Sequence, residues 1–215
     1  MDIEPDLIKY YSARANEYEN IYKKPERQED ILKSTLYLQE IFTGKNIFEL
    51  ACGTGFWTER LAITARHIVA TDRSEEVLAI ARNKSYQKNN VVFQNADIFD
   101  LAAELTFKNL FGGFIWSHIL LEKLPLFLDN LMNHAEAGAR FVFMDNNFVA
   151  QSNTPVSEID AAGNSYQERL LENGKAFKIL KNFPTEDSLR ALLKVRAREI
   201  KFMSLKYFWI IEFSI

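Results

Sequence analysis

The stretch NIFELACGTG, from Asn46 to Gly55, is the part of this chain that decides its fold. Asn46 to Ala51 is a short apolar run of the kind that forms a buried strand, and a turn with two glycines follows it directly. Glycine lets the backbone bend sharply and lets a ligand approach it closely, so we predict a strand–turn–helix unit whose helix begins near Phe56. The turn alone does not establish a dinucleotide site, because a dinucleotide fingerprint has a third glycine where Thr58 stands.

Strand-like and helix-like segments alternate on both sides of this unit, a pattern typical of a parallel α/β sheet. Two amphipathic helical stripes precede it, and Thr185 is expected to cap a later helix. The expected strands lie at residues 46–51, 67–71, 91–94, 113–117, 139–144, 175–180 and 205–213, with a polar loop at 151–163. We therefore predict a single domain over residues 1–215, with an N-terminal helical cap (1–44) and a core (45–215). Its seven-stranded, mostly parallel sheet has helices on both faces and an antiparallel last strand.

The composition excludes several classes of protein and of partner. With 47% hydrophobic and 26% charged residues among 215, the chain can bury its own core without disulfides or a metal. The single cysteine, Cys52, excludes an internal disulfide and a four-cysteine zinc site. The 29 Asp and Glu outnumber the 26 Lys and Arg, which is a poor basis for binding nucleic acid. No segment reads as an export signal or a membrane span. We expect a cytoplasmic monomer or homodimer with no membrane, nucleic-acid or metal partner.

Three acidic residues lie at or just after the predicted strand ends and indicate the kind of ligand. Asp72 ends the next strand, nineteen residues after Gly53, where an acid binds ribose hydroxyls. Glu49 lies at the mouth of the glycine turn, where its charge would repel the pyrophosphate of a dinucleotide. Asp97 follows the third strand and is placed for an adenine amino group. A phosphate-free, positively charged nucleoside fits this set, and S-adenosylmethionine has an adenosine, a sulfonium and an amino-acid tail.

At these positions the sequence resembles the class I S-adenosylmethionine-dependent methyltransferases of the small-molecule type. The motifs that carry the resemblance are residues 49–55 (ELACGTG), 69–72 (VATD), 95–97 (NAD), 117–118 (SH) and the leader 10–18 (YYSARANEY). The resemblance covers most of the chain and implies a Rossmann-like fold. It also implies in-line transfer of a methyl group from S-adenosylmethionine to a small-molecule acceptor, which leaves S-adenosylhomocysteine (SAH).

The resemblance also implies roles for the residues of the glycine turn. Gly53 and Gly55 let the backbone pass close to the methionyl part of the cofactor, and Glu49 lies under that tail, near its amino group. The neighbouring turn residues that the resemblance adds as cofactor contacts are Ala51, Cys52 and Thr54. Cys52 taken alone reads as a small buried filler, since nothing beside it predicts an activated thiolate.

The adenosine part is assigned to the ends of the second and third strands. The resemblance implies that Asp72 binds both ribose hydroxyls and that Arg73 lies beside the adenine. Asp97 would accept a hydrogen bond from the adenine N6, with Ala96 and Ile98 packed on the ring. From the residues alone, Asp72 could instead cap the helix that follows it, and Asp97 could be a turn residue.

The acceptor side is less determined by the sequence. The resemblance places the Ser117 backbone carbonyl near the methionyl amino group, and Tyr11 and Arg14 over the cofactor, with Arg14 a candidate for its carboxylate. Spacing alone makes Tyr11 a core residue. His118 is our candidate catalytic residue, either a general base or a hydrogen-bonded wall of the pocket. Arg169 and Lys181 read as solvated or structural side chains. We expect a small acceptor in an aromatic, partly polar pocket walled by the first helix, His118 and residues 145–166.

Two other functions stay open at this point. A nicotinamide-dependent oxidoreductase could use a similar sheet, although Glu49 and Thr58 count against it. A non-catalytic regulator could bind S-adenosylmethionine through the same residues, so the sequence does not separate it from an enzyme.

Overall fold

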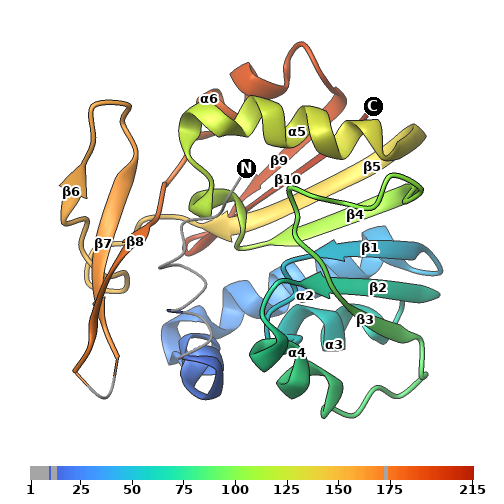
Figure 1. Cartoon of the computed structure of the whole chain (residues 1–215), viewed down its shortest axis with the longest axis horizontal. Helices are drawn as coiled ribbons and strands as arrows, with labels where there is room; N and C mark the ends of the chain where they lie inside the picture. Colours follow the sequence, from blue (N-terminus) through green and yellow to red (C-terminus); the bar gives the residue numbers. More distant parts are fainter. Residues whose placement is uncertain (1–9, 11–13, 172–173) are drawn as a thin grey trace.

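The computed structural model describes residues 10, 14–171 and 174–215, with the side chains of residues 15, 16 and 18 excepted. A twisted sheet forms the middle layer, and helices cover both of its faces (Figure 1). A small second sheet stands apart from it at one end. Within the described ranges, no helix combines the length and the apolar character needed to cross a membrane.

The helical segments of the described chain include four short 3-10 helices. In chain order the helices are η1 (Ala15–Lys23), η2 (Pro25–Arg27), α2 (Gln28–Phe42), α3 (Phe56–Ala62), α4 (Glu75–Arg82), η3 (Trp116–His118), η4 (Leu121–Lys123), α5 (Leu124–Asn133) and α6 (Glu186–Leu193). The strands are β1 (Asn46–Leu50), β2 (His67–Asp72), β3 (Val91–Asn95), β4 (Phe107–Gly113), β5 (Ala135–Asn146), β6 (Glu158–Ile159), β7 (Ser165–Leu170), β8 (Ala176–Leu180), β9 (Arg198–Ser204) and β10 (Phe208–Ser214).

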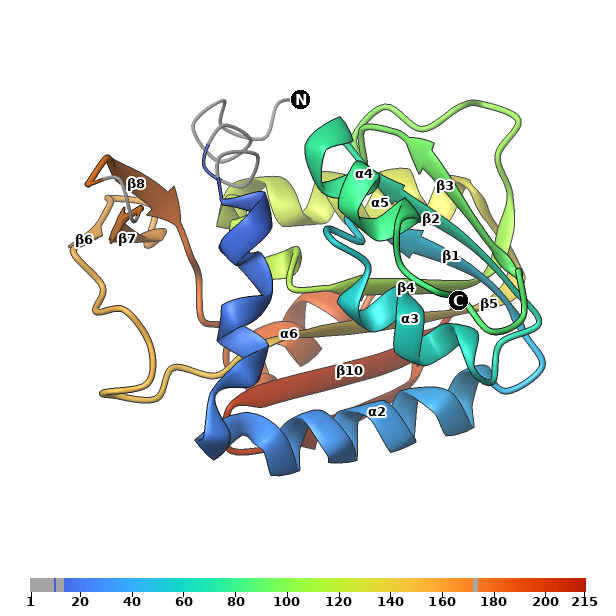
Figure 2. The same cartoon turned by 90° about the horizontal axis from the view of Figure 1, so that it is seen from below.

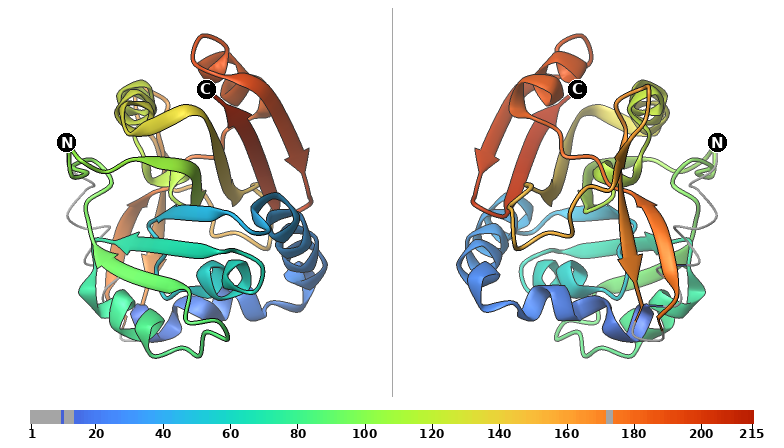
Figure 3. Two further views of the ribbon diagram at one scale, coloured as in Figure 1. Left: turned by 90° about the vertical axis from the view of Figure 1, so that its right-hand side faces the viewer. Right: turned by 90° about the vertical axis from the view of Figure 1, so that its left-hand side faces the viewer.

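The main sheet has seven strands in the order β3-β2-β1-β4-β5-β10-β9. Strands β1 to β5 pair in parallel, and β10 runs antiparallel to both β5 and β9. The predicted seven-stranded, mostly parallel sheet with an antiparallel last strand is therefore confirmed. Figure 3 shows β9 and β10 at one edge of this sheet and β3 at the other. Because the order reverses beside β1, the crevice beyond the carboxyl ends of β1 and β4 is the expected ligand site of such a sheet.

Alternation along β5 explains why both faces of the sheet are covered. Phe141 and Phe143 join one apolar cluster, to which α5 and α6 contribute Leu128 and Leu189. Their neighbours along the strand, such as Val142, lie in the other cluster, which α2 and α3 complete. Successive side chains of a strand point to opposite faces, so a continuous apolar run must be buried on both sides.

The 3-10 helix η1 lies across the carboxyl edge of the sheet and precedes α2 (Figure 2), and it forms the described part of the first predicted helical stripe. Glu19 of η1 accepts a hydrogen bond from the Thr54 hydroxyl at 2.8 Å. Lys84, after α4, forms an ion pair with the same carboxylate. These contacts fix η1 against the glycine turn.

Several predicted strand positions were wrong. The strand predicted at residues 113–117 is β4, which ends at Gly113, and a 3-10 turn follows it. Gly112 and Gly113 both belong to β4, and a Cβ at Gly112 would meet the Phe143 ring at 2.7 Å. Close packing between neighbouring strands requires glycine there.

The C-terminal half also departs from the prediction. The predicted strand at 175–180 is β8, but it pairs with β7 in the three-stranded sheet β6-β7-β8 instead of the main sheet. The seventh main-sheet strand is β9, which the sequence analysis missed. Its solvent-facing polar residues hide the apolar alternation of an edge strand. Part of the predicted loop at 151–163 forms the short strand β6. The predicted Thr185 cap of α6 is confirmed, because the Ser188 N–H donates to the Thr185 hydroxyl.

Candidate functional site

The glycine turn between β1 and α3 has the backbone geometry that its residues predict. Ala51, Gly53 and Gly55 all have positive φ angles, of 49°, 56° and 78°. A Cβ added at Gly55 would meet the Tyr86 hydroxyl at 2.8 Å and the Ala81 Cβ at 3.1 Å. The turn therefore requires glycine at this position for both conformation and space.

Asp72, at the end of β2, is tied to the glycine turn. Its Oδ2 accepts the Gly53 N–H at 2.9 Å, and its Oδ1 accepts the Ser74 N–H at 2.9 Å. Burial raises the pKa of Asp72, while these backbone donors oppose that rise. Ser74, and not Asp72, caps α4 by accepting the Val77 N–H. The carboxylate thus lies where the loops after β1 and β2 meet, with its position set by backbone donors.

Glu49 is a buried carboxyl group whose hydrogen bonds are incomplete. It is 1% exposed, and its Oε2 has no hydrogen-bond partner among the described residues. Burial raises the pKa of Glu49 to about 8, and the nearby charge of Asp72 adds to the rise. The Thr58 hydroxyl opposes it, yet Thr58 Oγ1 also lacks a well-formed hydrogen bond in the described chain. A cationic group beside Glu49 would satisfy this oxygen and favour its charge.

Asp97 follows β3, the strand next to β2, and faces the same edge of the sheet. Its Oδ2 pairs with Arg73 Nη1 at 3.0 Å, and its Oδ1 accepts the Phe99 N–H at 3.0 Å. Ala96 N–H donates to the Asp72 carbonyl at 3.1 Å, and Ile98 is buried in the apolar core. The structure therefore brings the three predicted acids to adjacent strand ends, while their roles toward the cofactor stay predictions.

The other turn residues also have defined surroundings. Thr54 is buried and donates to Glu19. Burial raises the pKa of the Cys52 thiol well above its usual value, so the thiol stays protonated and acts as a filler.

The predicted residues around the acceptor lie apart from the three acids. Tyr11 is outside the described residues. Arg14 Nη1 donates to the Tyr10 hydroxyl at 2.9 Å. The Ser117 carbonyl accepts the Asn182 N–H at 2.8 Å, so its predicted contact with the methionyl amino group requires a second hydrogen bond to the same oxygen.

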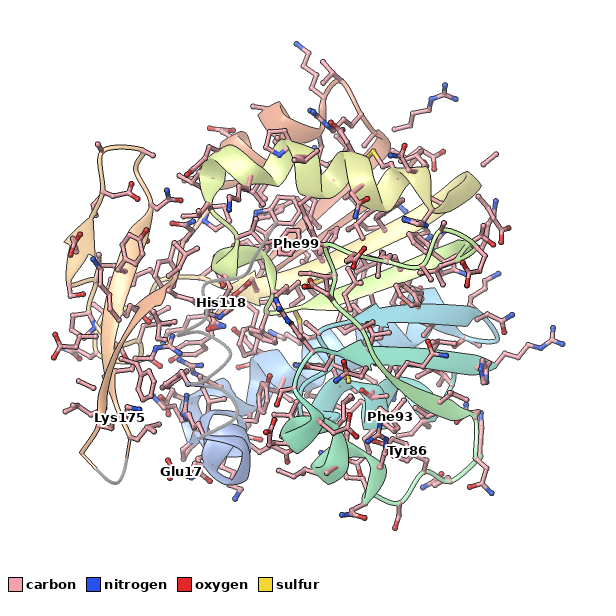
Figure 4. The ribbon with its side chains drawn as sticks, in the orientation of Figure 1. Glu17, Tyr86, Phe93, Phe99, His118 and Lys175 are labelled. Carbon is pink, nitrogen blue, oxygen red and sulfur yellow. The ribbon has the colours of Figure 1, made fainter. Side chains whose placement is uncertain are left out.

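His118, the last residue of η3, lies beside the end of β8 (Figure 4). Its Nδ1 lies 2.6 Å from the Leu180 carbonyl oxygen, a contact in which the carbonyl accepts and Nδ1 carries the proton. Burial lowers the pKa of His118 well below its usual value, and the charges of Lys181 and Arg169 lower it further. His118 is therefore a neutral imidazole whose lone pair is on Nε2.

Lys181 was predicted to be solvated or structural, and the structure excludes the solvated alternative. It is 3% exposed and directly follows β8. Its Nζ donates to Asp145 Oδ1 at 2.8 Å and to Ser117 Oγ at 2.6 Å. Asp145, fully buried in β5, also accepts the Ser117 N–H at 2.9 Å. The signal in the sequence for this ion pair was Asp145, the acid at the end of the fifth predicted strand. Its partner, Lys181, is 36 residues away, so no local pattern connects the two.

A cavity of about 30 Å³ lies beside this ion pair. The described residues that line it are Arg14, Ile21, Tyr22, Arg27, Phe114, His118, Asn146, Arg169, Lys181 and Phe208. They come from η1 and the residue before it, η2, the turn after β4, η3, the end of β5, the start of β10, β7 and the residue after β8. The expected walls of the acceptor pocket, namely the first helix, His118 and the segment after β5, are among them. The second sheet adds Arg169 and Lys181.

Comparison with known proteins gives a family match over the part of the chain that holds Glu49, Asp72 and Asp97. Residues 47–138 match the model of a methyltransferase domain. The malonyl-[acyl-carrier protein] O-methyltransferase of Bacillus anthracis is 32% identical over 142 residues, which cover 64% of this chain and 51% of that protein. The match thus spans about half the length of that relative.

Solved structures extend the similarity in fold to nearly the whole chain. The DhpI–SAH complex has a TM-score of 0.81 at 24% identity and covers 98% of this chain and 95% of that one. Magnesium protoporphyrin IX methyltransferase from Synechocystis PCC 6803, with bound SAM, has a TM-score of 0.66 at 14% identity. It covers 100% of this chain and 97% of that one. At these identities the similarity shows the fold.

Proposed function

We propose, since the chain belongs to the class I S-adenosylmethionine-dependent methyltransferase family, that it transfers a methyl group from S-adenosylmethionine to a small-molecule acceptor by in-line displacement. The single observation that best supports this proposal is the pair of carboxyl groups at the glycine turn, of which Glu49 is buried and Asp72 is half-buried. Glu49 Oε2 lacks a partner within the described chain, and Asp72 lies across the turn from it. An ammonium or sulfonium group fits such a site, whereas a pyrophosphate would be repelled.

The residues that would hold the cofactor divide into two groups along the edge of the sheet. Gly53 and Gly55 would leave room for the methionyl part, with Glu49 facing its ammonium group. Asp72 would take the ribose hydroxyls and Asp97 the adenine N6. When bound, S-adenosylmethionine supplies an already activated methyl group, so the protein's part is to align the acceptor and exclude water.

His118 acts in this proposal as a wall of the acceptor pocket. A general base works best when its pKa lies near the operating pH, and the pKa of His118 is held well below its usual value by burial. Its bond to the Leu180 carbonyl fixes the ring between the sheet and the hairpin. A positioned, neutral imidazole shapes the pocket without taking a proton.

Thermal unfolding with two ligands tests the cofactor. SAH should raise the melting temperature, because a ligand that binds only the folded state stabilises it, and NAD should leave the temperature unchanged. A rise in melting temperature with NAD and none with SAH would instead support a nicotinamide-dependent oxidoreductase.

Transfer of labelled methyl groups then tests the activity. Incubation with methyl-labelled S-adenosylmethionine and a metabolite extract should move the label into small molecules. Binding of SAH with no transfer to any fraction would support a non-catalytic regulator. The cytoplasmic location and the monomeric or dimeric state stay predictions.

A further inference from the structure

The cavity beside His118 is lined by positively charged side chains. Arg14, Arg27, Arg169 and Lys181 all contribute to it, and no Asp or Glu is among its lining residues in the described chain. A chain with net charge −3 has no general excess of cations to place there. The concentration of positive charge is therefore a property of this cavity.

Arg27 gives the strongest evidence that a negative partner belongs in the cavity. It is 2% exposed, and within the described residues no carboxylate forms an ion pair with its guanidinium. Its Nη2 donates to Ser152, to the carbonyl oxygen at 3.2 Å and to Oγ at 3.1 Å. Its guanidinium also lies 5.6 Å from the Tyr207 ring centre. A buried charge is costly unless it is paired.

The acid nearest to the cavity does not neutralise it. Asp145 is already engaged by Lys181 and by two backbone N–H groups, from Ser117 and Asn146. The Lys181–Asp145 pair contributes no net charge, so the positive charge along the lining of the cavity comes from its arginines. Arg169 is held by Gln167 Oε1, which accepts from its Nη2 at 2.7 Å.

The cations also act on one another. Burial lowers the pKa of Lys181, and the charges of Arg169 and Arg27 lower it further, against the effect of Asp145. Burial lowers the pKa of Arg27, and the charge of the neighbouring, exposed Glu26 opposes this without cancelling it. An anion in the cavity would relieve both the repulsion and the desolvation of these groups.

From this charge and geometry, and resting on the proposed methyltransferase function, we propose that the methyl acceptor is a small oxyanion of the carboxylate or phosphate type. Arg27 and Arg169 bind its charged oxygens in the cavity, and one of those oxygens receives the methyl group. Guanidinium groups suit this task, because their N–H donors match the geometry of carboxylates and phosphates. The cavity of about 30 Å³ suits a small charged group.

An ionised acceptor oxygen also fits the absence of a strong base at His118. Its lone pair forms the new bond to the methyl carbon while the carbon–sulfur bond breaks, and the electron pair of that bond stays on sulfur. The sulfonium becomes a neutral thioether, and the oxyanion loses one negative charge as it becomes an ester. No proton moves, so a neutral His118 suffices.

Anion binding tests the cavity without knowledge of the acceptor. With SAH present, inorganic phosphate or acetate should raise the melting temperature of the wild-type protein further. Arg169→Met should lose most of this second shift, while its shift with SAH alone stays. Arg190→Met is the matched control, because Arg190 pairs with Glu186 on the exposed face of α6. No added shift with either anion, or an equal shift in Arg169→Met, would overturn the proposal.

Arg27→Met repeats the test at the buried arginine, and the shift with SAH reports whether that variant folds. Should it not fold, the Arg169→Met result decides. If Arg169→Met loses SAH binding and not anion binding, the arginines serve the carboxylate of the cofactor and the proposal is wrong.

The labelled product identifies the source of the oxyanion. The extract is first separated by anion exchange, and each fraction is then incubated with the protein and methyl-labelled S-adenosylmethionine. Only the fractions that the resin retained before the reaction should accept the label. A carboxyl methyl ester releases labelled methanol in mild alkali, whereas a phosphate-type methyl ester keeps its label. Both products support the proposal. Label in neutral or cationic acceptors would overturn it while leaving the methyltransferase function intact, and failure to bind SAH would contradict that function itself.

Discussion

The two halves of the carboxyl edge of the sheet carry opposite charges. Beyond β1, β2 and β3 lie three carboxyl groups, of which Glu49 has an oxygen without a hydrogen-bond partner in the described chain. Beyond β4 and β5, with η1, η2 and the small second sheet, lies a cavity lined by four cationic side chains. Each half contains buried ionisable groups, Glu49 in one and Arg27 and Lys181 in the other, and a buried charge is costly without a partner.

This difference indicates how one site can take two unlike ligands. Carboxylates favour a cationic nucleoside, and guanidinium groups favour an oxyanion. Methyl transfer between the two would reduce both charges together. The separation of charge thus supports transfer of the methyl group from the acidic half to the cationic half. It would also keep the cationic ligand out of the cationic half and the oxyanion out of the acidic half.

The largest expected effect is on the cationic half. Lys181→Met should destabilise the protein by about 3–5 kcal/mol, because it leaves Asp145 buried without its partner. Urea unfolding would measure the change. The double variant with Asp145→Asn should recover part of the loss, and a loss of less than about 1 kcal/mol in Lys181→Met would show that the pair is not a structural element of this half.

The acidic half should respond to pH through Glu49. Its folded pKa of about 8 lies above the ordinary value of 4.5, so the folded state holds a proton that the unfolded state has lost between these values. The contribution of Glu49 to stability is therefore full below pH 4.5 and is lost as the pH rises to about 8.

Glu49→Gln should remove this pH dependence and stabilise the cofactor-free protein at pH 7 by roughly 3 kcal/mol relative to the wild type, because pH 7 lies about 2.5 pKa units above the unfolded value of 4.5. Unfolding free energies at pH 5 and pH 7 would test it. If the unfolding free energy changes equally between pH 5 and pH 7 in the wild type and in Glu49→Gln, Glu49 ionises normally. If the cofactor ammonium faces Glu49, binding should also release a proton, seen by calorimetry in two buffers.

Asp72→Ala should weaken SAH binding by about 1–3 kcal/mol, the scale of lost hydrogen bonds to a charged group. Asp72→Asn is the matched control, because it keeps one acceptor oxygen for the Gly53 N–H. Calorimetry gives the dissociation constants, and unchanged values in Asp72→Ala would remove Asp72 from the cofactor site.

The smallest expected effect concerns Arg73. Its ion pair with Asp97 is partly exposed, and such pairs contribute about 0–1 kcal/mol. Arg73→Met should therefore leave the unfolding free energy nearly unchanged in a urea titration. A loss well above that range would show that the acidic half, too, depends on an internal ion pair.

The acidic half could be predicted from the sequence, because its signals are local. A strand, a glycine turn and an acid at the next strand end follow one another within a short stretch, and parallel pairing brings strand ends to one edge. Glu49, Asp72 and Asp97 were found in this way. The alternation of strands and helices likewise determined the class of fold.

Only the tertiary structure decided the cationic half. Arg27, Asp145 and Lys181 are far apart in the sequence, and each alone resembles a solvated or capping residue. The sequence also misplaced β8 and missed β9, because strand pairing depends on contacts between distant segments rather than on local pattern. Local backbone preferences therefore determined the cofactor turn, while the long-range packing of the second sheet against η1 and β5 determined which buried charges lack partners.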